Sequence, residues 1–415
     1  MFVRPDAHAA AESRSSFASA TVSDFVKVLQ FAARQHIVEA REARALTLAL
    51  ETLAAAKVWR PRSELFNAYF AALGAVKGGA PDARAQLLQL GNVLLEERSG
   101  RGLDVEVPLR VEAGQVSVPA AGACVRLGAP EGAFTTPEWV EQVSGALGRE
   151  VAATWHRATL LPLRGATGPV SEAVEGYRRQ TSALSGRAQA LAALDVSSRE
   201  GAAVVALHDE ACALIERVDP ELARELTAVT EYVVLLRGGE FVGASTIRCF
   251  GATFLNMQPS WSALCFADHL VHEAAHQLLH TVQERQPLLL NRHFLGAPSP
   301  IRSDPRPLYG SFHATFVFLR LAGFMSRVLE SGAGQAREAE VRLHRHLLGL
   351  LQGLKVLRDD GEFSPQGRHA VDAWAEGARE LVRLHGRPSE ALCRQLDWDY
   401  EPPNTAMPML QLEAA

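Results

Sequence analysis

The feature of the sequence that could carry chemistry is an HExxH motif over residues 272–276. On a helix, His272 and His276 lie on the same face about 6 Å apart, so their imidazoles can bind one metal ion. Glu273 takes the position of the residue that serves zinc hydrolases as general base on a metal-bound water. Apolar residues flank the motif, which favours a buried metal site over a polar helix face with hydrogen-bonded histidines.

A third ligand must come from elsewhere in the chain. His280 continues the four-residue series, but it lies about 12 Å along the helix from His272, too far to share an ion with bonds of about 2.1 Å. We expect it to support a ligand or to lie on the surface. The spacing after the motif matches neither the metzincin third histidine nor a thermolysin-like glutamate helix. His313, which opens the next apolar helix, is the predicted third ligand, with a core histidine as the alternative; His269 and His293 are weaker candidates.

Three arginines, Arg292, Arg302 and Arg306, lie in the segment that leads to this histidine. A guanidinium group suits the recognition of a carboxylate because it donates two parallel hydrogen bonds. Arg306 stands between two prolines that restrict the backbone, and we select it as the residue that binds an acidic ligand beside the metal. The alternative is a solvated loop with surface arginines.

The elements that must position these residues are mostly helical. Apolar residues recur at three- and four-residue steps, and they predict helices from residue 23 onward and over 62–76, 83–97, 136–147, 172–192, 201–217, 220–230, 261–285, 335–357 and 365–386, with one more from Tyr309. Alternating, Val-rich stretches predict short strands over 105–128, 231–239 and 243–259. The predicted fold is mainly α with a small β-sheet (α+β), and the metal site lies between the long HExxH helix and the helix that follows.

Composition narrows the class of protein. The chain has 415 residues, of which 47% are hydrophobic and 21% charged, so it is globular rather than disordered. A net charge of −5 without a dense basic block argues against nucleic-acid and anionic-membrane partners. Five scattered cysteines without a CxxC pair, together with the lack of a signal pattern or a long apolar run, predict a cytoplasmic location.

Three segments together resemble a known family. The stretch Gly243-Ala244-Ser245, the run LVHEAAHQ at 270–277 and the run SDPRPLYGSFHATFVFL at 303–319 are similar to the HExxH-motif proteins found beside ribosomally made peptide precursors. The resemblance covers about residues 200–385. Studied members of this family resemble iron(II)- and 2-oxoglutarate-dependent oxygenases that hydroxylate a side-chain Cβ of a precursor peptide.

The resemblance implies a role for each matched residue. His272 and His276 become iron ligands, His313 becomes the third, and Arg306, with Arg302 beside it, becomes the clamp on the distal carboxylate of 2-oxoglutarate. Three protein ligands leave three positions for the cosubstrate and dioxygen. Glu273 then orients a ligand, or is itself an alternative ligand, instead of serving as a hydrolytic base.

Two other functions stay open, because imidazole ligands accept zinc as well as iron. One is a zinc metallopeptidase that uses the HExxH residues, and the other is a non-catalytic peptide-binding protein. For the domains, we predict a disordered tail over 1–20, a helical N-terminal region with short strands and a peptide-docking role over 21–200, the catalytic domain over 201–390, and a C-terminal tail over 391–415.

Overall fold

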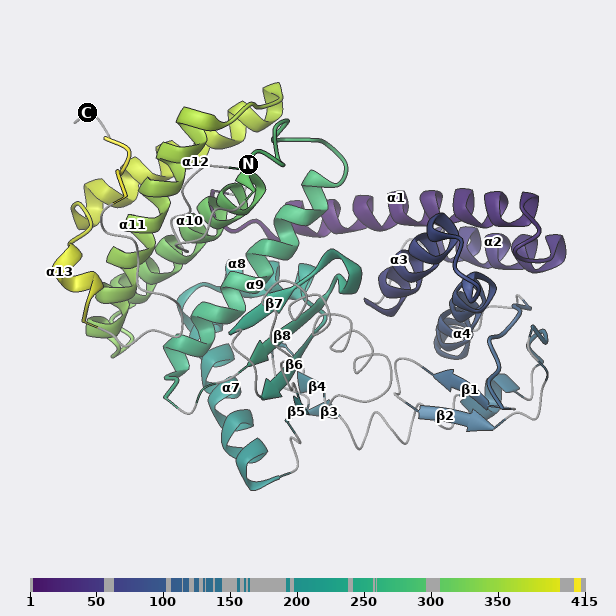
Figure 1. Ribbon diagram of the computed structural model, residues 1–415. Coiled ribbons are helices and arrows are strands. Elements are labelled where there is room, and N and C mark those ends of the chain that lie inside the picture. The colour runs from purple at the N-terminus through teal and green to yellow at the C-terminus, as the bar shows by residue number, and fades with distance from the viewer. Residues whose placement is uncertain are drawn as a thin grey trace.

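The structure is a computed structural model of the chain (Figure 1). It describes residues 3–55, 63–101, 106–113, 115–118, 123–126, 130, 132–136, 139–143, 155–156, 160–161, 163–164, 192–194, 198–237, 242–256, 258, 260–295, 307–395 and 407–411. The helix expected over 172–192 falls outside these residues except at its last position.

Helices dominate the described residues, which confirms the predicted mainly helical α+β class. The helices are α1 (Ala7–Arg34), α2 (Ala40–Ala55), α3 (Ser63–Gly78), α4 (Ala83–Arg101), α7 (Arg199–Val218), α8 (Pro220–Val229), α9 (Ala263–Gln283), α10 (Leu308–Ser331), α11 (Ala336–Asp360), α12 (Pro365–His385) and α13 (Glu390–Cys393). A short 3-10 helix, η1, spans Ile247–Cys249. From α7 to α12, these bounds agree with the predicted ranges to within a few residues.

The strands form one mixed sheet and a separate hairpin. The hairpin pairs β1 (Gln115–Val118) with β2 (Ala123–Arg126). The sheet contains β3 (Trp155–His156), β4 (Leu163–Arg164), β5 (Ala192–Ala193), β6 (Tyr232–Arg237), β7 (Gly243–Ser245) and β8 (Ala252–Asn256). Its order is β3-β4-β6-β8-β7, with β5 also paired to β6. The strands β6 and β8 are parallel and almost wholly buried, whereas β7 runs antiparallel to β8 at the end of the sheet.

Helix ends follow signals that lie in the local sequence. Helix α9 begins after Ser262, whose hydroxyl accepts the N–H of Cys265 at 2.9 Å, and α12 begins after Ser364 in the same way. Each cap satisfies a backbone donor that the first helical turn leaves unpaired. Helix α10 ends at Ser331 and is followed by Gly332, whose φ of 66° lies in the left-handed region that favours glycine.

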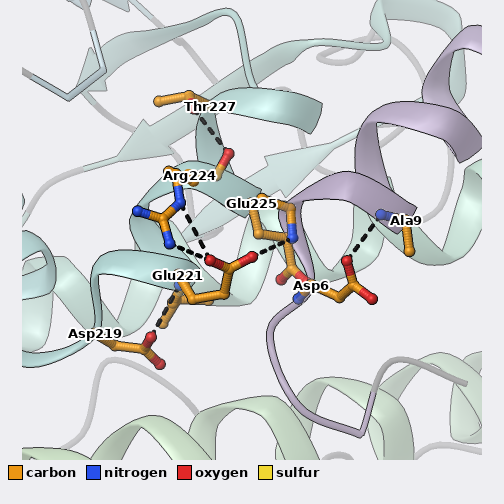
Figure 2. Close-up of polar contacts among 9 residues, drawn as sticks. Asp6, Ala9, Asp219, Glu221, Arg224, Glu225 and Thr227 are labelled. Carbon is orange, nitrogen blue, oxygen red and sulfur yellow. Dashed lines mark hydrogen bonds and ion pairs between the residues drawn. The ribbon is translucent and has the colours of Figure 1, made fainter.

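The beginning of the chain differs from the predicted disordered tail over 1–20. Helix α1 starts at Ala7, and carboxylates of α8 accept its first N–H groups (Figure 2): Asp6 donates to Glu225 at 2.9 Å and Ala7 donates to Glu221 at 2.8 Å. Negative groups are favourable at this positive end of a helix. The small, polar local sequence carries no sign of this anchor, which comes from residues more than 200 positions away.

The long helix α1 runs from the helices around the sheet to α2, α3 and α4 (Figure 1), and its residues belong to two hydrophobic cores. Its first half packs with the sheet and α7 to α12, and its second half packs with α2, α3 and α4. Phe17 of α1, Phe66 of α3 and Phe250 after η1 form an aromatic cluster with ring centroids 5.1–5.3 Å apart. This cluster joins the N-terminal helices to the sheet.

Two predicted boundaries also differ from the structure. The strands β3, β4 and β5 lie before residue 200 but pair within the sheet of the predicted 201–390 unit, so the sheet crosses that boundary. In the predicted tail, α13 adds a short helix, and the described residues 407–411 pack on α11, where Leu410 donates to the carbonyl of Leu351 at 3.0 Å.

Helix α10 is central to the larger core. Among the described residues it alone has the length and apolar composition of a membrane-crossing helix, a property that buried core helices share. Most of α10 is buried, and it packs against α9, α11 and α12. Its burial accounts for its apolar composition.

Candidate metal centre

Helix α9 carries two polar stripes, which begin at successive residues and therefore face different directions. His276 faces His313 of α10 with His272 beside it, whereas Glu273 and Gln277 face the sheet at β7 and β8. Gln277 fixes the helix to the sheet: its amide oxygen accepts the N–H of Gly251 at 2.6 Å, and its amide nitrogen donates to the hydroxyl of Thr253 at 3.1 Å. The imidazoles and the carboxyl of the HExxH motif therefore face two different elements that pack against α9.

The structure brings all three expected ligand histidines into contact. Nε2 of His276 lies 3.2 Å from Nε2 of His272, and Nδ1 of His276 lies 3.1 Å from Nδ1 of His313 on α10. Both histidines of the motif are partly exposed, while His313 is buried. Helices α9 and α10 together thus hold a row of imidazoles that solvent reaches at one end.

Gln283 determines the tautomers along this row. Its amide oxygen lies 2.5 Å from Nε2 of His313, and because an amide oxygen only accepts, His313 donates there and keeps its lone pair on Nδ1. His276 then donates from Nδ1 to His313 and presents the lone pair of Nε2 to His272. A ligand histidine whose second nitrogen donates to a neighbour is the usual arrangement at metal sites.

The three rings form a row and do not converge on one point. The two nitrogens of His276 point in different directions, and one faces His272 while the other faces His313. Accordingly, within the described ranges no three His, Cys, Asp or Glu side chains are arranged to hold one ion. The 3.2 Å between Nε2 of His272 and Nε2 of His276 does suit a shared ion, because two bonds of about 2.1 Å span at most about 4.2 Å.

Burial keeps these imidazoles neutral. It lowers the pKa of His276 to about 3 and that of His280 to about 4, and it holds the pKa values of His272 and His313 well below their usual range, with the neighbouring imidazoles adding to the effect. A metal ion binds the neutral form of histidine. The imidazoles of the row are therefore in the neutral form at neutral pH.

Glu273 lies on the other side of α9, against β7. A Cβ added at Gly243 would lie 2.6 Å from its Oε1 atom, so the carboxyl is in direct contact with the backbone of that strand. Burial raises the pKa of Glu273 to about 8, and the nearby hydroxyl of Ser245 opposes this shift only in part. The other oxygen, Oε2, is buried without a hydrogen-bond partner among the described residues.

The remaining candidates occupy different surroundings. His280 does support the row, since its ring centroid is 4.8 Å from that of His313 and its Nδ1 lies 3.3 Å from the hydroxyl of Tyr309. His269 stacks on Trp261 with centroids 4.2 Å apart. The exposed His293 accepts a hydrogen bond from the neighbouring Arg292.

Both arginines expected to bind a cosubstrate, Arg302 and Arg306, lie outside the described residues. Their flanking segments are described and lie together: Leu308 donates to the carbonyl of Phe294 at 2.9 Å, and Tyr309 donates to that of Arg292 at 3.1 Å. The described residues on the two sides of the predicted loop therefore meet at the first turn of α10.

The sequence interpretation missed one buried polar group next to the row. Asp268, one helical turn before His272, accepts hydrogen bonds from Arg342 at 2.9 Å and His346 at 3.0 Å, both on α11. Burial alone would raise the pKa of Asp268, but His346 and Arg342 more than offset it and hold the pKa well below its usual range. The four-residue spacing of Asp268 from His272 was the available signal.

Comparison of the chain with protein-family models and with curated protein sequences returns no match. The functional assignment therefore rests on the side chains of the candidate site.

Proposed function

We propose that the protein is an iron(II)- and 2-oxoglutarate-dependent oxygenase that hydroxylates a side-chain Cβ of a ribosomally made precursor peptide. The observation that carries this proposal is the row of neutral imidazoles from α9 and α10, partly open to solvent. The resemblance of the HExxH and DPRPL segments to peptide-modifying proteins supports the same chemistry.

In this proposal His272 and His276 would hold the iron through Nε2, and His313 would be the third protein ligand after its ring turns away from Nδ1 of His276. All three are neutral imidazoles, a ligand type that suits iron. Iron with 2-oxoglutarate and dioxygen supplies the oxidising power, with succinate and carbon dioxide released. The distal carboxylate of the cosubstrate is assigned to Arg306 and Arg302.

The chain's own residues prepare this site in two ways. Gln283 holds His313 in the tautomer that keeps its lone pair on Nδ1, so this nitrogen carries no proton. Asp268, with Arg342 and His346, anchors α9 on α11 one turn before His272. The second contact holds the helix that carries two of the proposed ligands in place before any ligand arrives.

The test is succinate release by the chain loaded with iron(II) without oxygen, then given 2-oxoglutarate, air and a library of synthetic peptides. We expect succinate and a peptide that is heavier by one oxygen atom. His276→Ala removes the central imidazole and abolishes both, while His369→Ala, at an exposed position of α12, is the matched control. Metal retention without succinate release would overturn the oxygenase proposal.

A zinc metallopeptidase is the second candidate, because the neutral imidazoles of His272 and His276 suit zinc as well as iron. Glu273 would be its general base, but the carboxyl packs against β7 on the other side of α9 and burial raises its pKa to about 8, and both facts count against this candidate. The same peptide library distinguishes the two functions: a peptidase cleaves peptides with zinc alone and loses cleavage in Glu273→Gln. If no variant binds metal or changes a peptide, the third candidate, a non-catalytic peptide-binding protein, takes their place.

We place the protein in the cytoplasm, with a peptide as its partner and neither nucleic acid nor membrane. The described free cysteines are all buried, and burial raises the pKa of Cys212 and Cys249 to about 12. These thiols are packed as small apolar groups, in keeping with a reducing compartment.

A further inference from the structure

The strand β7 ends the sheet, and no described strand pairs with its outer edge (Figure 1). Its register with β8 shows which backbone groups point outward. Asn256 donates to the carbonyl of Val242 at 2.8 Å, and the pairing continues in antiparallel register along β7. Residues 242 and 244 therefore face β8, whereas the N–H and C=O groups of Gly243 and Ser245 point away from the sheet.

Exposure along the strand agrees with this pattern. Ala244 is buried, but Gly243 and Ser245 are partly exposed. The hydroxyl oxygen of Ser245 is itself buried, so the exposed part of this residue consists of other atoms. Glycine, alanine and serine are also the residues that leave most room for a second backbone.

The same strand touches the HExxH motif. Side chains of alternate residues share one face of a strand, and the Gly243 and Ser245 face is the one against which the Glu273 carboxyl packs. A segment added at the outer edge would lie about 4.8 Å from β7. It would therefore run along the part of the sheet next to α9, the helix that also carries His272 and His276.

We propose that the outer edge of β7 binds the substrate peptide as an added, extended strand. Main-chain groups provide the bonds, as in other cases of strand addition to a sheet edge, so the edge accepts many sequences and leaves selection to side-chain contacts. The inference rests on the proposed function for its substrate class, a peptide. It adds the place where the peptide docks and the conformation that it adopts there.

A second copy of the chain fits this edge less well. Only two residues, Gly243 and Ser245, present outward groups, and main-chain hydrogen bonds contribute about 1 kcal/mol each. A pair of three-residue strands is far smaller than a stable protein interface. A short peptide, by contrast, needs only a few such bonds together with contacts to its side chains.

Hydrogen exchange of the free protein is the first test. We expect the amide of Ser245 to exchange quickly and that of Ala244, which donates to β8, to be protected. Protection of both amides to the same degree would show that another part of the chain already covers the edge, and it would overturn the proposal.

Peptide binding without iron or cosubstrate is the second test, with fluorescently labelled synthetic peptides of random sequence as the probe. Ser245→Pro removes the outward N–H, a change that edge strands tolerate, and Ser245→Ala keeps it. For peptides that bind the unaltered chain, we expect at least a roughly tenfold loss of affinity in the proline variant and little change in the alanine variant. Equal affinities for both variants would refute the proposal, and so would a library from which no peptide binds.

Methylation of the peptide backbone makes the result independent of how the proline variant folds. N-methyl groups placed along a bound peptide should weaken binding at every second position, because alternate amides of a strand face the sheet edge. Uniform tolerance would overturn the added strand. A dimer of the free chain that the proline variant dissociates would assign the edge to a second copy instead. Because neither test uses iron, bound peptide without succinate release counts against the proposed reaction and not against the docking edge.

Discussion

Replacing Glu273 by Gln tests whether this carboxyl is protonated in the folded chain. Burial raises its pKa from 4.5 to about 8, so the folded protein holds a proton there that the unfolded chain releases above pH 4.5. Between these two values the folded state binds more protons than the unfolded state, and the free energy of unfolding falls as pH rises. Glutamine cannot ionise, so the variant lacks this loss.

The size of the effect follows from the pKa shift. Each pH unit between 4.5 and 8 lowers the free energy of unfolding of the unaltered protein by about 1.4 kcal/mol. Relative to the unaltered chain, the free energy of unfolding of the variant should therefore rise by about 3 kcal/mol between pH 4.5 and 7. The rise should reach about 5 kcal/mol in total above pH 8, where Glu273 is ionised in both the folded and the unfolded chain. A difference in stability between Gln and a protonated Glu is the same at every pH, so it does not affect the change with pH.

Urea denaturation with a chelator present, followed at several values between pH 5 and 8.5, measures this difference. The buried Trp261 and Trp374 provide a fluorescence signal from the core that holds Glu273. Glu221→Gln is the control: backbone and Arg224 contacts lower the pKa of Glu221, so its effect should be nearly constant over this range. A difference between Glu273→Gln and the unaltered chain that does not grow with pH would show that the folded carboxyl is ionised and would refute its assignment to a dry contact with β7.

Three further changes probe the surroundings of the row. Gly243→Ala places a methyl group 2.6 Å from the Glu273 carboxyl and should cost about 1–3 kcal/mol by urea denaturation, whereas Gly323→Ala on α10, with its nearest neighbour 3.6 Å away, should be neutral or stabilising. Asp268→Asn leaves the buried Arg342 without its carboxylate and should cost about 3–5 kcal/mol in the same assay; a loss below 1 kcal/mol would contradict the buried ion pair. Gln283→Leu removes the acceptor for His313, and nitrogen NMR of the metal-free protein should show a mixture of tautomers there instead of one, while an unchanged spectrum would refute the role of the amide.

Local periodicity made most of the second half of the fold predictable. Apolar residues at three- and four-residue steps specify both a helix and its buried face, so α9 and α11 appear close to their expected ranges. The anchor of α1 was not predictable in this way. Its acceptors, Glu221 and Glu225, are on a distant helix, and only the folded chain brings them to the first turn.

The candidate site was likewise predictable where it depends on local sequence and not where it depends on distant residues. The HExxH spacing was enough to place two imidazoles on one face of a helix. Asp268 was missed because its partners lie 74 and 78 residues further along the chain. The contact of Glu273 with β7 was missed for a related reason, since Gly243 meets this carboxyl only when α9 packs on the end of the sheet.

The sequence by itself determined which nitrogen-bearing side chains share a face of α9, because backbone geometry repeats every few residues regardless of the neighbours. Only the tertiary structure decided which ring nitrogen of each histidine faces which neighbouring residue. Rotation about side-chain bonds leaves the orientation of a ring open until partners from other elements constrain it. Here Gln283, at the end of α9, and His313, on α10, set the row in which His276 gives one nitrogen to each neighbour.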